Sequence, residues 1–317
     1  MHISYGKARV PLMRVYAHPL TGLTPIPESA FSGRPNNLFA AEIDVEVFGD
    51  NFLPAYTVGD NRMVVATDSM KNVVLDQALA YEGATLEGFL GQLGYFLLST
   101  YSQMESLRLT GRELPFAAVP VPDGSAGAHF SDSPVVYQRG HDDASQAVLE
   151  FARDGDSIAV NAHRCGRVGL ELLKVTGSSF THFVRDAYTT LPERRERPLF
   201  VFLDVFWRYT YVADLLALDP VRYVAAEQVR DLIRVVFHEF VSESIQHLVY
   251  EMGQRVLARF PQLAEVAFDA QNHTPDPMAV SESDPRVKVY STPFPAYGLI
   301  HLTLTREGSA PTSTTFT

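Results

Sequence analysis

The strongest constraint on the fold is a pattern of strands and helices that occurs twice along the 317 residues. In each half, a pair of strand-like stretches precedes helical sequence, and further strand-like stretches follow. In the first half, strands are predicted at 8–18, 37–48 and 106–120, with a strand end at 62–67 and a helix at about 85–104. Further short strands are predicted near 134–138, 146–152 and 157–163. In the second half, strands are predicted at 168–175, 199–212, 264–270, 286–291 and 298–305, with helical sequence over about 225–259. No residue-level repeat accompanies the pattern, so two similar structural units are predicted from the order of elements alone.

Two breaks divide this pattern further. The stretch 121–133 (VPDGSAGAHFSDS) is rich in small residues and has no periodicity, which predicts a loop and a domain boundary. The expected units are therefore 1–130 and 131–317. The long helical stretch is interrupted by Ser242–Ser244, and serine is a good N-cap residue. A second helix is expected to begin there, opened by Ile245 and Gln246.

Charge and cysteine content exclude several classes of protein. The formal net charge is -11, and a surface of this sign repels phosphate backbones and anionic lipids, so neither nucleic acid nor a membrane is an expected partner. The longest apolar stretch, near 89–101, is interrupted by polar residues and is too short to span a bilayer. One cysteine, Cys165, allows no intrachain disulfide, which is typical of a reducing compartment, and it is expected to be a packed thiol rather than a nucleophile or metal ligand. Without a signal peptide or a peroxisomal Ser-Lys-Leu ending, the cytoplasm is the expected location.

Four short strings carry side chains suited to chemistry: YGKARV with Lys7, ATDSMKN with Thr67 and Asp68, FTHFVRDAYTTLPERRERPL with Phe180 and Arg197, and SESIQ with Gln246. A weaker fifth is QNHT, with Asn272 and His273. Each has an ordinary structural interpretation on its own. The lysine, the glutamine and the charge run around the arginine could be solvated, the threonine and aspartate could form a turn or helix cap, and the phenylalanine could be core.

Taken together and in order, the strings resemble the urate oxidase (uricase) family. VVATDSMKN and FVRDAYTTL match the family almost residue for residue, and the resemblance extends over nearly the whole chain. It implies an α+β chain of tandem tunnelling-fold (T-fold) units with antiparallel sheets backed by helices. It further implies that subunits associate to close a barrel, that two barrels stack into a homotetramer, and that the active sites lie at subunit interfaces.

The resemblance also assigns residues that hold the substrate. Urate is a flat purine anion, so an aromatic ring and a bidentate cation suit it, and Phe180 and Arg197 are expected to supply them. The Gln246 amide offers both a donor and an acceptor to the purine edge. The backbone N–H of Ile245 would donate at a helix start, where the dipole favours an anion.

A proton relay is the second implied part of the site. In the family a lysine and a threonine move protons, which here are Lys7 and Thr67, and Asp68 supports this region with hydrogen bonds. A lysine acts as a base only where burial or a nearby positive charge lowers its pKa. The substrate supplies the electrons, so no cofactor is expected. The implied reaction consumes urate and molecular oxygen and yields 5-hydroxyisourate and hydrogen peroxide.

One segment departs from the family pattern. Many members carry Asn-x-His near this point, where the histidine completes the relay, whereas this chain reads QNHT. Asn272 aligns as the residue facing the oxygen or water site. His273 then falls one position early and Thr274 takes the usual histidine position. His273 is kept as a catalytic candidate, and either the loop shifts or the relay is built differently.

Other functions are compatible with parts of the sequence. Another T-fold enzyme acting on a purine or pterin, such as a cyclohydrolase, would need a histidine and cysteine metal site, whose motif is not visible. A purine-binding protein without catalysis is disfavoured by the presence of both Lys7 and Thr67. Metal is not expected, because HExxH and paired CxxC motifs are absent, although His163 stands near Cys165. The phosphate-binding patterns GxGxxG and GxxxxGK[ST] are absent too.

Overall fold

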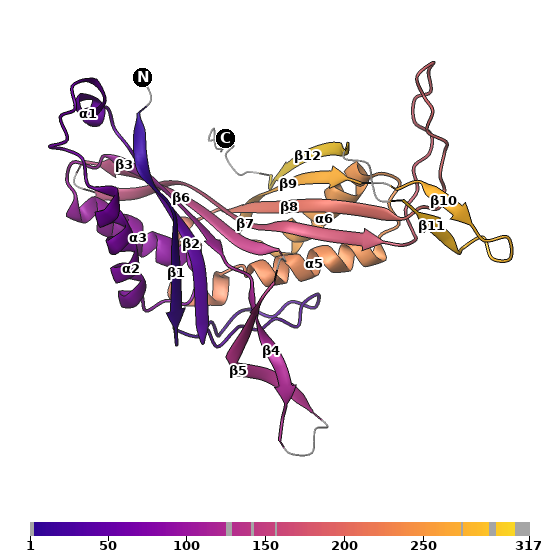
Figure 1. The fold of residues 1–317 in the computed structure, drawn as a ribbon, viewed down its shortest axis with the longest axis horizontal. Coiled ribbons are helices and arrows are strands. Elements are labelled where there is room, and N and C mark those ends of the chain that lie inside the picture. The colour runs from indigo at the N-terminus through magenta and orange to yellow at the C-terminus, as the bar shows by residue number, and fades with distance from the viewer. Residues whose placement is uncertain are drawn as a thin grey trace.

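An antiparallel sheet of eight strands runs through the molecule (Figure 1). The computed structural model describes residues 3–124, 129–140, 143–155, 157–273, 275–291 and 296–307. The sheet contains β1 (Ser4–Val15), β2 (Leu38–Phe48), β3 (Ser106–Glu113), β6 (Ala144–Asp154), β7 (Ser157–Lys174), β8 (Leu199–Tyr209), β9 (Leu263–Asn272) and β12 (Gly298–Thr305). The strands lie side by side in this order, and every neighbouring pair is antiparallel.

Two pairs of helices cover one side of this sheet (Figure 1). Helices α2 (Thr67–Ala80) and α3 (Leu86–Thr100) pack against the first four strands, and α5 (Ala226–Glu239) and α6 (Ile245–Arg259) pack against the last four. Each pair encloses its own buried apolar cluster, represented by Leu90 and Phe151 in one and by Trp207 and Leu232 in the other. The prediction of antiparallel strands backed by helices is therefore confirmed, as is the repeat of strand pair, helices and strand pair.

Short helices and two hairpins lie outside the eight-stranded sheet. They are η1 (Asp50–Phe52), α1 (Leu53–Thr57), α4 (Val212–Leu216), η2 (Pro220–Arg222), the hairpin of β4 (Phe116–Pro122) and β5 (Phe130–Arg139), and the hairpin of β10 (Pro277–Val280) and β11 (Lys288–Tyr290). The β4–β5 hairpin and the segment between β7 and β8 both project away from the body of the sheet (Figure 1).

Several predicted elements occur as expected. The helix predicted at 85–104 is α3, and the break in the long helical stretch separates α5 from α6. Ser244 is the N-cap of α6, because its side chain accepts a hydrogen bond from the N–H of His247. Cys165 is fully buried in the second apolar cluster, as expected for a packed thiol.

Other predicted elements were wrong in extent or type. The segment 62–67 is not a strand end but a turn that leads into α2, which the sequence interpretation missed. That helix buries only Met70, Val74 and Ala78, a narrow stripe that gives a weak periodic signal. The stretch 106–120 forms two strands, β3 and β4, and the stretches 157–163 and 168–175 both belong to the long strand β7. A register shift interrupts β7 near Gly169, whose φ of 78° suits a residue without a side chain.

The expected boundary at 121–133 falls within the β4–β5 hairpin. Beyond this hairpin, β6 pairs with β3 and so extends the sheet of the first half. We therefore propose that the first unit reaches Asp154 at the end of β6, rather than ending at residue 130.

Among the described residues, no helix combines the length and the apolar character needed to cross a lipid bilayer.

Candidate functional site

Lys7, Thr67 and Asp68 lie near one edge of the sheet. Lys7 is in the edge strand β1, just before a bulge in its pairing with β2. Thr67 is the first residue of α2, and the approach to this helix is held by a hydrogen bond of 3.1 Å from the N–H of Val65 to the Tyr5 hydroxyl. Lys7 and Thr67 are both half-buried. The start of β1 and the start of α2 thus bring the two predicted relay residues to the same region.

The Asp68 carboxylate is exposed and pairs with its neighbour on α2. Its Oδ1 atom lies 2.6 Å from Nζ of Lys71. This hydrogen bond is the main cause that lowers the pKa of Asp68, and the charges of Lys71 and Lys7 lower it further. Asp68 is therefore an ionised group close enough to Lys7 to interact with its charge.

Phe180 and Arg197 form the second part of the predicted site. Phe180 pairs with Arg194 through two backbone hydrogen bonds, with N to O distances of 2.7 and 3.1 Å. The backbone N–H of Arg197 donates to the Ser178 carbonyl at 3.0 Å. The Cζ atom of Arg197 lies 5.3 Å from the centre of the Phe180 ring, in range for a cation–π contact. The segment between β7 and β8 therefore holds an aromatic ring and a cation side by side.

Arg197 is buried, with 5% of its surface exposed. Burial lowers the pKa of its guanidinium, and the nearby Arg194 lowers it further. A guanidinium with little access to water interacts more strongly with an anion than one on the surface. This side chain is the described feature most suited to hold a flat anion.

The beginning of α6 joins this part of the site through the backbone. The N–H of Ser179 donates to the Ser242 carbonyl at 2.9 Å, two residues before the Ser244 cap. Ile245 is buried at the first helical position, and Gln246 is exposed beside it. The structure therefore brings the start of α6, with Gln246, to the segment that carries Phe180.

Asn272 ends β9, and His273 follows it. Asn272 lies opposite Val201, the third residue of β8. Arg197 lies two residues before the start of this strand. The N–H of His273 donates to the Phe200 carbonyl at 2.9 Å, and its ring lies 4.3 Å from that of Phe202. Both residues therefore stand at the same end of the second half as Arg197.

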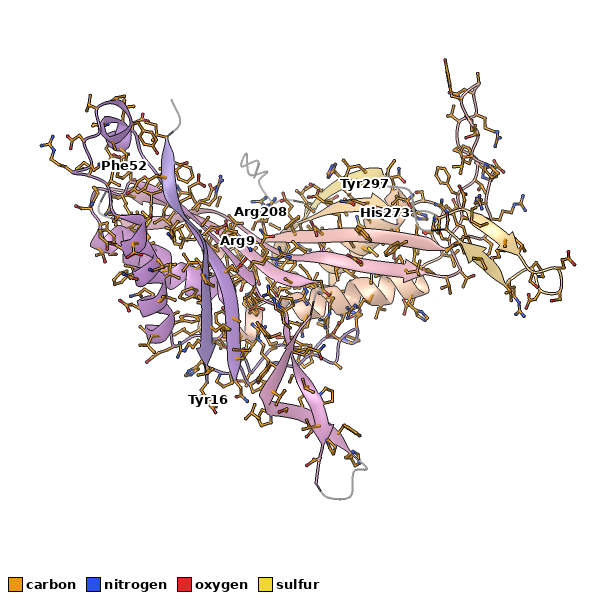
Figure 2. All side chains as sticks on the ribbon, viewed as in Figure 1. Arg9, Tyr16, Phe52, Arg208, His273 and Tyr297 are labelled. Carbon is orange, nitrogen blue, oxygen red and sulfur yellow. The ribbon has the colours of Figure 1, made fainter. Side chains whose placement is uncertain are left out.

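The two neighbours point to different faces of the sheet. Side chains alternate along β9, so Asn272 shares a face with Ala270, which is fully buried. The His273 ring packs against Phe202, which lies opposite Gln271, and against Tyr297 at 5.1 Å (Figure 2). His273 is thus on the other face, and its catalytic role stays a prediction. Thr274 lies outside the described residues.

Within one chain the two parts of the site are far apart. Five strand spacings separate β1 from β8 in the sheet, on the order of 20 Å at the usual distance between strands. Phe52, which packs against Tyr5 near the first part, and His273 lie in opposite halves of the molecule (Figure 2). A single chain therefore does not assemble Lys7 and Arg197 into one pocket.

A cavity of about 590 Å³ lies elsewhere, beside the β4–β5 hairpin and α5. Several of its charged side chains pair with one another. Arg34 lies 2.5 Å from Glu113 and 3.2 Å from Glu227, and Arg167 pairs with Asp143. None of the predicted site residues lines this cavity in the described part of the chain.

His163, which the sequence offers as a possible metal ligand near Cys165, makes a hydrogen bond to the backbone instead. Nε2 of His163 accepts a hydrogen bond of 2.9 Å from the N–H of Tyr209, and burial lowers the pKa of this histidine to about 4. Among residues 3–307, leaving out the gaps given above, no cluster of three or more His, Cys, Asp or Glu side chains is placed to hold a metal ion.

Sequence interpretation missed several residues around Phe180. The ring of Phe183 stacks on that of Phe180, and Arg194 holds the backbone of Phe180 in place. The only sequence signal for the stack is the spacing of two phenylalanines in FTHF. That spacing predicts contact in a helix but not in an irregular segment.

Comparison with known proteins agrees with the resemblance. The family model described as Uricase matches residues 163–301. A uricase of Haloferax volcanii is 48% identical over 272 residues, which cover 86% of this chain and 88% of that protein. The uric acid degradation bifunctional protein PucL of Bacillus subtilis is 47% identical over 305 residues. The match covers 96% of this chain but only 61% of PucL, so the chain spans about three fifths of that relative.

Solved structures give the same result for the fold. A urate oxidase from Bacillus sp. TB-90 has a TM-score of 0.92 and 42% identity, with 96% of this chain and all 100% of that chain covered. A uricase from Bacillus fastidious has a TM-score of 0.90 and 40% identity, with coverage of 96% and 93%.

Proposed function

The chain belongs to the uricase family, and from this premise we propose that it oxidises urate with molecular oxygen and water to 5-hydroxyisourate and hydrogen peroxide, without a cofactor. In this reaction urate gives two electrons to oxygen. Water supplies the oxygen atom that is added to the purine, and the dioxygen takes up the two electrons and two protons and leaves as hydrogen peroxide. The observation that supports the proposal most directly is the buried Arg197 guanidinium beside the Phe180 ring.

The second half of the chain would bind the substrate. Urate would stack on Phe180, and Arg197 would donate two parallel hydrogen bonds to the edge of the anion. Gln246 would pair with the alternating carbonyl and N–H groups of the purine, and the N–H of Ile245 would donate from the start of α6. Asn272 would face the position of oxygen or water.

The first half of the chain would move the proton. Urate with one more proton removed is a better electron donor, so Lys7 would accept this proton through the Thr67 hydroxyl. Both residues are half-buried near the start of β1 and α2, and Asp68 lies next to them. His273 is proposed as a further member of the relay on the family resemblance.

These two halves would meet across a subunit interface. The separation of β1 from β8 prevents Lys7 from reaching Arg197 in one chain. The edge strands β1 and β12 each pair on one side only in the described structure, and an open edge can pair with a second copy. We propose that two chains join at these edges into a barrel, and that two barrels stack into a homotetramer.

The test is to add urate to the purified protein in air. The ultraviolet absorbance of urate should fall while oxygen is consumed and hydrogen peroxide appears in equal amount. The same protein without oxygen should bind urate and leave its absorbance unchanged. A non-catalytic purine-binding protein would bind urate in air and leave it intact, and this result would reject the proposed reaction.

Treatment with a chelator tests the absence of a metal requirement. Activity should be the same before and after treatment. Loss of activity that one metal restores would reject the cofactor-free mechanism and favour a metal-dependent T-fold enzyme.

A further inference from the structure

The ring of Phe183 stacks face to face on the ring of Phe180. The two ring centres are 4.9 Å apart and the planes differ by only 10°. This is an offset-stacked geometry, one of the favourable arrangements of two aromatic rings. Phe183 is half-buried, and its ring is in turn contacted by Arg185, whose Cζ atom lies 5.7 Å from its centre. One face of Phe180 is therefore at least partly covered by a protein ring.

A backbone turn at His182 makes this stack possible. His182 has a φ of 59°, in the left-handed region that residues with side chains rarely adopt. Its N–H donates to Oε1 of Glu193 at 3.0 Å, and its Nδ1 atom lies 3.0 Å from Oγ1 of Thr181. These contacts hold the turn, which folds Phe183 back toward Phe180.

Two side chains contact the Phe180 ring: Phe183 stacks on it, and the Arg197 guanidinium lies 5.3 Å from its centre. The residue lies outside the regular strands, and its backbone is held by an isolated bridge to Arg194. Arg194 is itself fixed by an ion pair of 2.6 Å with Asp276. These contacts fix the position of the backbone, but a ring on this backbone can still turn about its side-chain bonds. The parallel contact with Phe183 limits that rotation.

We propose that Phe183 is a positioning residue, which sets the plane of Phe180 and hence the plane in which a purine stacks, and that the left-handed turn at His182 holds Phe183 in this place. The inference rests on the proposed function, because it takes Phe180 as the surface on which urate stacks. A ring that is already oriented loses less conformational entropy when the ligand binds, so the stack strengthens binding without touching urate.

Two substitutions at position 183 test the role of the ring. Phe183→Leu keeps the apolar volume but removes the flat face, whereas Phe183→Tyr keeps both. Urate binding is measured without oxygen by calorimetry, and KM and kcat are measured in air. Phe183→Leu should raise Kd and KM together by roughly 2- to 12-fold, the usual contribution of one aromatic pair, and should change kcat less. Phe183→Tyr should bind as the wild type does.

The melting temperature of each variant separates positioning from folding. The inference is overturned if Phe183→Leu binds urate normally, or if it loses only thermal stability. Because binding is measured without oxygen, the test does not depend on oxidation. A wild-type protein that binds urate but does not oxidise it would reject the proposed reaction alone, and one that does not bind urate would reject both.

A second pair of variants tests the turn. His182→Gly and His182→Val both remove the imidazole, but glycine adopts a positive φ freely and a β-branched residue does not. His182→Gly should bind urate with the wild-type Kd, and His182→Val should weaken binding as Phe183→Leu does. The double variant His182→Val, Phe183→Leu should bind urate no more weakly than Phe183→Leu alone. Equal losses in the glycine and valine variants would show that the imidazole acts and would overturn the role of the turn. If the valine variant does not fold, His182→Ala provides the same comparison.

Discussion

The hydroxyl of Tyr223 donates a hydrogen bond of 2.9 Å to Oε2 of Glu87. Glu87 lies in α3 of the first half and Tyr223 follows η2 in the second half, so this bond joins the two helical layers. Glu87 is 3% exposed, and burial raises the pKa of its carboxyl to about 7. The buried Cys165 thiol lies close enough for the charge of Glu87 to raise its pKa, in addition to the larger effect of burial. A buried carboxyl that titrates near neutral pH therefore connects the two halves.

This arrangement predicts that stability falls as pH rises. The folded pKa of Glu87 is about 7 and the ordinary value is 4.5, so the folded state binds the proton more tightly than the unfolded state. The protein should lose on the order of 1–3 kcal/mol from this group between pH 5 and pH 8. Glu87→Gln keeps an acceptor for Tyr223 but cannot ionise, so it should lose less stability over this range. Chemical unfolding of both proteins at the two pH values, at one protein concentration, measures the difference, and equal losses would contradict the prediction.

Arg197 is predicted to hold the urate anion through its planar guanidinium. Arg197→Ala should weaken urate binding by roughly 2–4 kcal/mol, because a charge-assisted bidentate contact is lost from a desolvated site. Arg197→Lys should not restore binding, since an ammonium group cannot form two parallel hydrogen bonds in a plane. The exposed Arg195 gives a matched control, and Arg195→Ala should bind normally. Anaerobic calorimetry measures each Kd, and normal binding by Arg197→Lys would show that the proposed geometry is wrong.

Lys7 is predicted to act as the base. Lys7→Met keeps the length and apolar bulk of the side chain but cannot accept a proton. Turnover should fall by roughly 10²–10⁴-fold, the usual contribution of a positioned general base, while the anaerobic Kd for urate changes much less. Lys288→Met, in β11, is the matched control and should keep its turnover.

Thr67 and Lys7 should act as one unit. Thr67→Ala removes only a hydroxyl, so its effect on turnover should be largely lost when Lys7 is already methionine. Turnover of the two single variants and the double variant measures this coupling. Additive losses, or near-normal turnover in Lys7→Met, would remove the relay from the mechanism and leave the binding site unaffected.

The proposed interface predicts that two inactive variants complement each other. Lys7→Met leaves the second-half residues intact, and Arg197→Ala leaves the first-half residues intact. When the two proteins are unfolded together and reassembled, some interfaces should combine two intact half-sites and recover part of the activity. Each variant reassembled alone is the control. If mass measurement shows mixed oligomers and activity does not return, the site must lie within one chain.

Local features of the sequence were sufficient to predict much of the fold. The helix α3 has a broad apolar stripe, and the start of α6 has a serine cap, so each is defined by residues close together in the chain. The helix α2 was missed because its buried stripe is narrow. The stretch 121–133 predicts a boundary loop because it is rich in small residues, and it overlaps the ends of β4 and β5.

The sequence by itself determined that strands and helices follow the same order twice, and that the candidate residues belong to known motifs. Periodicity, helix caps and motifs can be read in this way because each depends on residues that are close together in the chain. Only the tertiary structure decided which of these residues meet. The distance between Lys7 and Arg197 follows from the order of strands in the sheet, and the separation of Asn272 from His273 follows from the face each side chain occupies. The stack of Phe183 on Phe180 depends on a left-handed backbone conformation at His182, which the presence of a histidine does not by itself predict. Such relationships depend on pairing and packing between distant segments, whose free energy is gained only when the whole chain is folded.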